Sequence, residues 1–184
     1  LALNNLEKRE AIKEEILDDP SDDGKPPAIA VLPFKNLSND EEQEYFADGI
    51  TEDIIANLSL WKTFPVISRN SSFTFKNTTE KSDVISKALG ARYLVEGSVR
   101  KGGNKVRITA QLTSADDDKQ IWSKRWDRSL EDIFEVQDEV SRDVAALISP
   151  ALKDQEQVKL SSKGKKNFGA WDEYLQGLNI YNTE

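Results

Sequence analysis

Two stretches near the front of the chain differ in how their hydrophobic residues are spaced. Residues 28–34 form a continuous apolar run bounded by prolines, as expected of a strand buried on both faces of a sheet. Further on, apolar residues recur at a helical interval, namely Phe46, Ile50, Ile54, Leu58 and Trp61. This spacing predicts an amphipathic helix, which Gly49 can split, with Thr51 capping the second half.

The next part of the chain predicts a short strand and a short helix. Residues 64–68 are typical of a second strand. Residues 70–79 are rich in Ser and Asn and are expected to form a loop. A helix is expected over residues 82–89, ended by Gly90 in the usual position after a helix.

Three further strands follow at hairpin spacing. Residues 93–100 and 105–113 alternate apolar and polar positions, with Gly102-Gly103-Asn104 as the turn between them. Asp116-Asp117-Asp118 is expected to be a solvated turn before a strand over residues 120–126. Trp122 and Trp126 share one face of that strand, where they either pack under a helix or offer a stacking platform to a ligand.

A last helix is expected after Ser129, which can cap it together with Asp132. Its apolar stripe consists of Ile133, Val136, Val140, Val144, Leu147 and Ile148, and Pro150 lies near its expected end. The predicted order is therefore β-α-β-α-β-β-β-α. It indicates an α/β (α+β) fold with one mixed five-stranded sheet and helices packed on it.

The same patterns divide the chain into four parts. Residues 1–27 are polar and acidic and predict a linker or a weak helix, and residues 28–150 form the globular domain. Residues 151–166 are expected to be a polar linker, and residues 167–184 regain amphipathic character. Because Leu1 is not a usual start, the chain is expected to be a fragment of a longer protein.

Composition removes several classes of chemistry. Cys, His and Met are absent, which excludes disulfides, thiolate nucleophiles, Ser-His-Asp triads and zinc sites built on Cys or His. The net charge of −8, from 33 acidic and 25 basic residues, argues against a nucleic-acid partner. No apolar run approaches the roughly 18 residues of a membrane span.

One acidic cluster needs an explanation. Glu44, Asp48 and Glu52 are spaced by four and would share a helix face, where they could hold Mg²⁺ or Ca²⁺. The simpler interpretation is that acidic residues near a helix start are favoured by the helix dipole, so we expect no metal site and no cofactor.

The best candidate for a pocket edge is the loop after the second strand, because ligands of α/β sheets often bind at strand ends. The candidate ligand-binding residues there are Asp48, Ser71, Ser72 and Phe73. No set of nucleophile, base and oxyanion donors can be assembled from the sequence, and no catalytic residue is predicted.

Several runs of residues resemble the TolB-like domain of bacterial signalling proteins. They include Ala30-Val31-Leu32-Pro33-Phe34, Tyr45-Phe46-Ala47-Asp48-Gly49, Val95-Glu96-Gly97-Ser98-Val99, Ile121-Trp122-Ser123 and Trp126-Asp127-Arg128. The resemblance covers residues 28–150. Residues 170–178 resemble the region that leads into tetratricopeptide repeats.

The resemblance implies a context and no activity of its own. Such modules follow a class III adenylate/guanylate cyclase domain or a DNA-binding regulator, often across a membrane span, and precede tetratricopeptide repeats. It therefore implies a non-catalytic regulatory or protein-interaction module of a cyclase-like signalling protein. Its partner would be another protein or adjacent domains of the same chain.

Alternatives remain open at this point. The domain could be a small-ligand sensor of a membrane-linked transcription regulator, or an enzyme that uses the carboxylate cluster with a metal. Any membrane contact would come from a span outside the fragment, which leaves open the cytoplasmic or the periplasmic side of a bacterial inner membrane.

Overall fold

The structure is a computed structural model that describes residues 27–62 and 64–162. Five strands form one sheet: β1 (Ile29–Val31), β2 (Lys35–Asn36), β3 (Tyr93–Gly102), β4 (Lys105–Ser114) and β5 (Lys119–Ser129). Four helices are described: α2 (Glu42–Trp61), α3 (Arg69–Phe73), α4 (Ser82–Leu89) and α5 (Ile133–Ser162). None of these helices has both the length and the apolar character needed to cross a bilayer.

The sheet is mixed, as the sequence predicts. Its strand order is β1-β3-β4-β5, and β2 lies beside the second half of β3. β1 and β2 run parallel to β3, whereas β3, β4 and β5 form an antiparallel meander. The turn between β3 and β4 is the predicted one, and Gly103 there takes a φ of 61°, which glycine adopts without steric cost.

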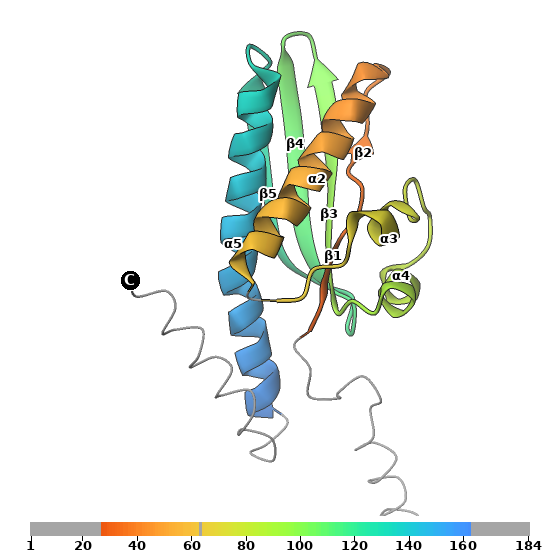
Figure 1. Cartoon of the computed structure of the whole chain (residues 1–184), viewed down its shortest axis with the longest axis vertical. Coiled ribbons are helices and arrows are strands. Elements are labelled where there is room, and N and C mark those ends of the chain that lie inside the picture. The colour runs from red at the N-terminus through yellow and green to blue at the C-terminus, as the bar shows by residue number, and fades with distance from the viewer. Residues whose placement is uncertain (1–26, 63, 163–184) are drawn as a thin grey trace, which may run out of the picture. The chain divides into compact units, whose positions relative to one another are not determined.

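The two faces of the sheet are covered differently (Figure 1). α2 and α5 lie together over one face, where the alternating residues of β4 are buried; these are Val106, Ile108, Ala110 and Leu112. On the other face, Ile85 of α4 packs against Ala30, Leu32 and Leu94 near β1. No other described helix covers that second face over β4 and β5.

The predicted strand over residues 64–68 is wrong, and so is its place in the element order. Only Val66 pairs there, through a single parallel bridge to Ile29. Pro65 accepts a hydrogen bond from the Ile29 N–H but has no N–H to donate, so the ladder cannot lengthen. The fifth strand is instead β2, which forms after Pro33 interrupts the predicted run 28–34.

The chain around Phe34 ties β1 and β2 to α2. Where the strand is interrupted, the Phe34 N–H donates to Thr51 Oγ1 at 3.0 Å, and that hydroxyl donates to the Ala47 carbonyl at 2.8 Å. Thr51 thus bonds inside an unbroken helix and caps nothing, so the predicted split of α2 at Gly49 is wrong. Gly49 lies against Gln137 of α5, where a Cβ would be closer than 3.0 Å to the amide.

Both ends of α5 differ from the sequence prediction. Its first turn is capped by Asp132, whose Oδ1 accepts from the N–H groups of Phe134 and Glu135, rather than by Ser129, which still belongs to β5. The helix also continues through Pro150 to Ser162, so residues 151–162 of the predicted polar linker are helical. Leu152 in this extension is fully buried. Residues 1–26 of the predicted segment 1–27, residues 163–166 of the predicted linker, and the whole predicted segment 167–184 lie outside the described residues.

The close approach of the Phe34 ring to Gly97 allows this packing to be tested. The Phe34 ring lies over Gly97 of β3, and a Cβ at Gly97 would also meet the Thr109 carbonyl. We therefore expect Gly97→Ala to lower the free energy of unfolding by about 1–3 kcal/mol through overpacking.

Gly102→Ala in the same strand is the matched control, because a Cβ there meets nothing within 4 Å. It should change the free energy of unfolding by less than ~0.5 kcal/mol in the same urea titration. Equal stability of the two variants would contradict the described position of Phe34.

Candidate functional site

The segment after Val66 contains three of the four predicted ligand-binding residues. It forms α3, a five-residue helix where a loop was expected, and the Ser68 hydroxyl caps it by accepting from the Ser71 N–H at 3.4 Å. Ser71 is exposed and its hydroxyl accepts from Ser68 Oγ at 3.1 Å. Ser72 is buried, and its Oγ has no hydrogen-bond partner in the described part of the chain. The Arg69 guanidinium lies over the Phe73 ring, with Cζ 4.0 Å from the ring centroid.

Asp48, the fourth predicted residue, faces this segment from α2. Lys76, three residues beyond Phe73, places its Nζ 2.7 Å from Asp48 Oδ2 and 2.9 Å from Glu44 Oε1. One turn further along α2, Glu52 forms an ion pair with Arg69. Salt bridges therefore join α2 to Arg69 of α3 and to Lys76 in the segment that follows α3, and a common site of the four predicted residues stays a prediction.

These contacts also explain the acidic cluster. Its three carboxylates share one face of α2, as expected, and each is bonded to a cation of the α3 segment. Burial lowers the pKa of Lys76, but the hydrogen bonds of Asp48 and Glu44 outweigh it and hold that pKa above the usual value. Within residues 27–62 and 64–162, no group of three acidic side chains has a geometry suited to a metal ion.

A small cavity lies away from the predicted residues. It is lined by the end of α2, by Phe64 and Val66, and by Ile148 of α5. Its volume of about 10 Å³ is close to that of a single water molecule, too little for an organic ligand.

A buried polar network lies in the part of α5 beyond Pro150, and the sequence analysis did not predict it. Glu156 is 4% exposed; it accepts a hydrogen bond from the Tyr93 hydroxyl and lies 3.3 Å from Arg92 Nη1. Asp116 joins the network, 3.6 Å from Arg92 Nε and 2.8 Å from Lys159 Nζ. The signal that could have found it is the spacing of four that continues the apolar stripe from Ile148 to Leu152 and then to Glu156.

Tyr93 is fully buried in this network. Burial raises the pKa of the Tyr93 phenol well above its ordinary value, and the hydrogen bond and negative charge of Glu156 raise it further. The phenol therefore stays neutral and donates to Glu156, fixing the last turns of α5 against the start of β3.

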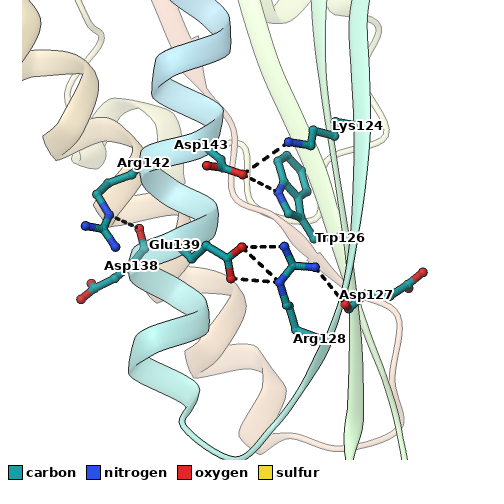
Figure 2. A network of polar contacts seen from close by, with 8 residues as sticks. All are labelled: Lys124, Trp126, Asp127, Arg128, Asp138, Glu139, Arg142 and Asp143. Carbon is teal, nitrogen blue, oxygen red and sulfur yellow. Dashed lines mark hydrogen bonds and ion pairs between the residues drawn. The ribbon is translucent and has the colours of Figure 1, made fainter.

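A second network fastens the first half of α5 to β5 (Figure 2). Arg128 meets both carboxylate oxygens of Glu139, with Nε 2.9 Å from Oε2, and this hydrogen bond holds the pKa of Glu139 below its usual value. The Trp126 indole donates to Asp143 at 3.0 Å, and Lys124 lies 3.4 Å from the same carboxylate. Hydrogen bonds from Trp126 and then Lys124 hold the pKa of Asp143 below its usual value.

Of the two tryptophans of β5, Trp126 follows the first of the two expectations. Trp126 is 2% exposed beneath α5, and its ring centroid lies 6.3 Å from that of the half-buried Trp122. Trp126 is thus a packing residue whose polar edge is satisfied by Asp143.

Comparison with known proteins gives one strong sequence relative. No family model matches the chain. Over 146 residues, 79% of the chain, it is 49% identical to a protein from Rhizobium meliloti (strain 1021) described as "Putative adenylate cyclase 3". The chain spans 25% of the length of that relative.

Solved structures give weaker likenesses. The PelC dodecamer from Paraburkholderia phytofirmans matches 68% of this chain and 88% of its own, at 15% identity and a TM-score of 0.45. The LpoB C-terminal domain from Escherichia coli matches 56% of this chain and 83% of its own, at 19% identity and a TM-score of 0.45. TolB from Acinetobacter baumannii matches 70% of this chain and 28% of its own, at 17% identity and a TM-score of 0.44. Each TM-score is below 0.5, and we base no conclusion on these likenesses.

The Glu156 network can be tested by truncating its carboxylate. We expect Glu156→Ala to lower the free energy of unfolding by roughly 1–3 kcal/mol, because it leaves the buried Tyr93 hydroxyl without an acceptor. Asp154→Ala, exposed on the same helix, is the matched control and should change it by less than ~0.5 kcal/mol. A loss no larger than the control's would contradict the docking of residues 151–162.

The raised pKa of Tyr93 predicts a loss of stability at alkaline pH. The folded phenol keeps its proton while the unfolded one ionises near pH 10.0, so the contribution is complete below that pH and falls as pH rises above it. Between about pH 10 and 11.5, the decline should be shallower in Tyr93→Phe by about 1.4 kcal/mol per pH unit. Parallel declines in urea titrations of both proteins would show that the phenol ionises freely.

Proposed function

We propose that this domain is a non-catalytic regulatory or protein-interaction module of a bacterial adenylate/guanylate cyclase-like signalling protein. The observation that carries the proposal is the 49% identity to a protein described as an adenylate cyclase, of which this chain spans a quarter. The output activity would then belong to another part of the parent chain. Tetratricopeptide repeats after the domain are part of the same proposal.

The chemistry of the described residues supports a module without catalysis. Transfer of phosphoryl groups depends on carboxylates that hold Mg²⁺ and on cations that meet the phosphates. Here Asp48 and its neighbours on α2 are bonded to Lys76 and Arg69. Glu139 and Asp143 are likewise bonded to side chains of β5. Glu156 is bonded to Tyr93 of β3 and to Arg92, the residue before β3.

The proposal predicts that the chain does not cyclise nucleotides. Residues 1–184, incubated with ATP or GTP and Mg²⁺ or Mn²⁺, should release no cyclic nucleotide above the protein-free control. The longer parent protein, assayed in parallel, serves as the positive control. Cyclic nucleotide from the fragment, lost on Asp48→Asn, would overturn the proposal.

The alternative, a small-ligand sensor at Asp48, Ser71, Ser72 and Phe73, has one observation in its favour. The Ser72 hydroxyl is buried without a hydrogen-bond partner in the described part of the chain. Thermal unfolding against nucleotides, sugars, amino acids and divalent cations separates the two proposals. A ligand at 100 times its Kd should raise the Tm by roughly 5–11 °C.

Such a rise, absent in Ser72→Ala, would favour the sensor over the interaction module. A flat panel would instead favour a partner that is a protein. Ser71→Ala is the control, because its exposed hydroxyl bonds to Ser68.

A further inference from the structure

One face of the sheet carries cations that the rest of the structure does not use. We call it the open face: the side of β2 to β5 that points away from α2 and α5. The strand register sets Lys35, Ser98, Thr109 and Arg125 in one row across it. The next row holds Arg100, Arg107 and Asp127, and Lys105 lies two residues before Arg107 on β4.

The charge of the open face is opposite to that of the chain. Acidic residues outnumber basic ones by eight in the whole sequence. The open face, however, carries five cations and two carboxylates. The carboxylates are Glu96 and Asp127, and the cations are Lys35, Arg100, Lys105, Arg107 and Arg125. Asp127 bonds Arg107 at 2.7 Å and Arg125 at 3.6 Å. In the described part of the chain, Lys35, Arg100 and Lys105 have no ion-pair partner.

The register contains a feature that folding alone does not favour. Arg100 and Arg107 lie directly opposite each other on neighbouring strands. Like charges in that position destabilise a sheet. Asp127 already bonds Arg107 through two hydrogen bonds and offsets part of this repulsion. Arg100 has no ion-pair partner in the described residues, and its guanidinium can bind a carboxylate of a partner through two hydrogen bonds.

The shape and chemistry of the open face select the class of anion. Ser98, Thr109 and Ser123 at the centre of the open face have short side chains. An extended polypeptide chain can therefore approach the sheet closely there. No aromatic residue of β3, β4 or β5 points to this face, and single-stranded nucleic acids need such rings for stacking. Carboxylates two residues apart on an extended segment are spaced by about 7 Å, as are Lys105 and Arg107 along β4.

We propose that the open face, centred on Arg100, Arg107 and Arg125, docks an acidic polypeptide segment of a partner protein. This rests on the proposed function of an interaction module and names the chemistry of its partner. The five cations supply complementary charge, and the exposed positions of Arg100 and Arg125 leave them accessible.

The test uses fluorescein-labelled oligoglutamate as the probe, followed by anisotropy at low ionic strength, where the Debye length is ~30 Å. The variant is Arg100→Glu with Arg125→Glu, and it should bind the probe at least roughly tenfold more weakly than the parent sequence. The matched control is Arg142→Glu with Lys153→Glu on α5, which changes the net charge equally. The control should weaken binding by no more than about twofold, and added salt should abolish binding in all three proteins.

Each other outcome overturns the proposal. Equal losses in both double variants would show that the probe senses net charge alone. Tighter binding of single-stranded DNA to the same arginines would replace the polypeptide with a nucleic acid. Much tighter probe binding after deletion of residues 1–26 would make the chain's own acidic run the occupant. If residues 1–184 form no cyclic nucleotide but the open-face variant binds oligoglutamate as tightly as the parent sequence, this inference is wrong and the proposed function still stands.

Discussion

The attachment of α5 to the sheet is the contact on which the rest of the domain depends. Its first half is joined to β5 by Arg128 with Glu139 and by Trp126 with Asp143 (Figure 2), and its last turns are joined to β3 by Glu156 with Tyr93. α5 and α2 together cover one face of the sheet, to which the apolar residues of β4 all point, whereas Leu94 of β3 packs with Ile85 of α4 on the other face. The opposite face is left polar over β4 and β5.

This arrangement gives many charged residues a structural role in joining the elements. The carboxylates spaced by four on α2 bond Lys76 and Arg69 and so fix α3 beside α2. The buried Glu156 fixes the end of α5. Charges of both signs are therefore used to join helices to each other or to the sheet, while Lys35, Arg100 and Lys105 of the open face have no ion-pair partner in the described residues.

The sequence predicted those parts of the fold that depend on local patterns. The alternation around Val106 and Ile108, the glycine turn at Gly103 and the helix ended by Gly90 are all present. It failed where distant residues decide the outcome. The Phe34 N–H, just before β2, donates to Thr51 on α2, and the pairing at Val66 is limited to one bridge by Pro65. Residues 151–162 are polar in composition, yet Tyr93 and Arg92 give Glu156 a buried partner that no local pattern reveals.

The predicted site residues illustrate the same limit. Spacing placed Glu44, Asp48 and Glu52 on one helix face, but it could not show that the cations facing them come from positions 69 and 76. The open face was equally hidden, because it becomes visible only when the register of four strands brings Lys35, Arg100 and Arg125 to the same side.

The central claim, that the domain docks an acidic polypeptide segment of a partner protein on the open face, is tested most directly by hydrogen–deuterium exchange on residues 1–184 with and without the oligoglutamate probe. The account predicts that amides of β4 and β5 and of the turn around Gly103 exchange more slowly when the probe is bound, with little change in α2 and α3. Added protection confined to α2 and α3 around Asp48 and Ser72, with β4 and β5 unchanged, would contradict it.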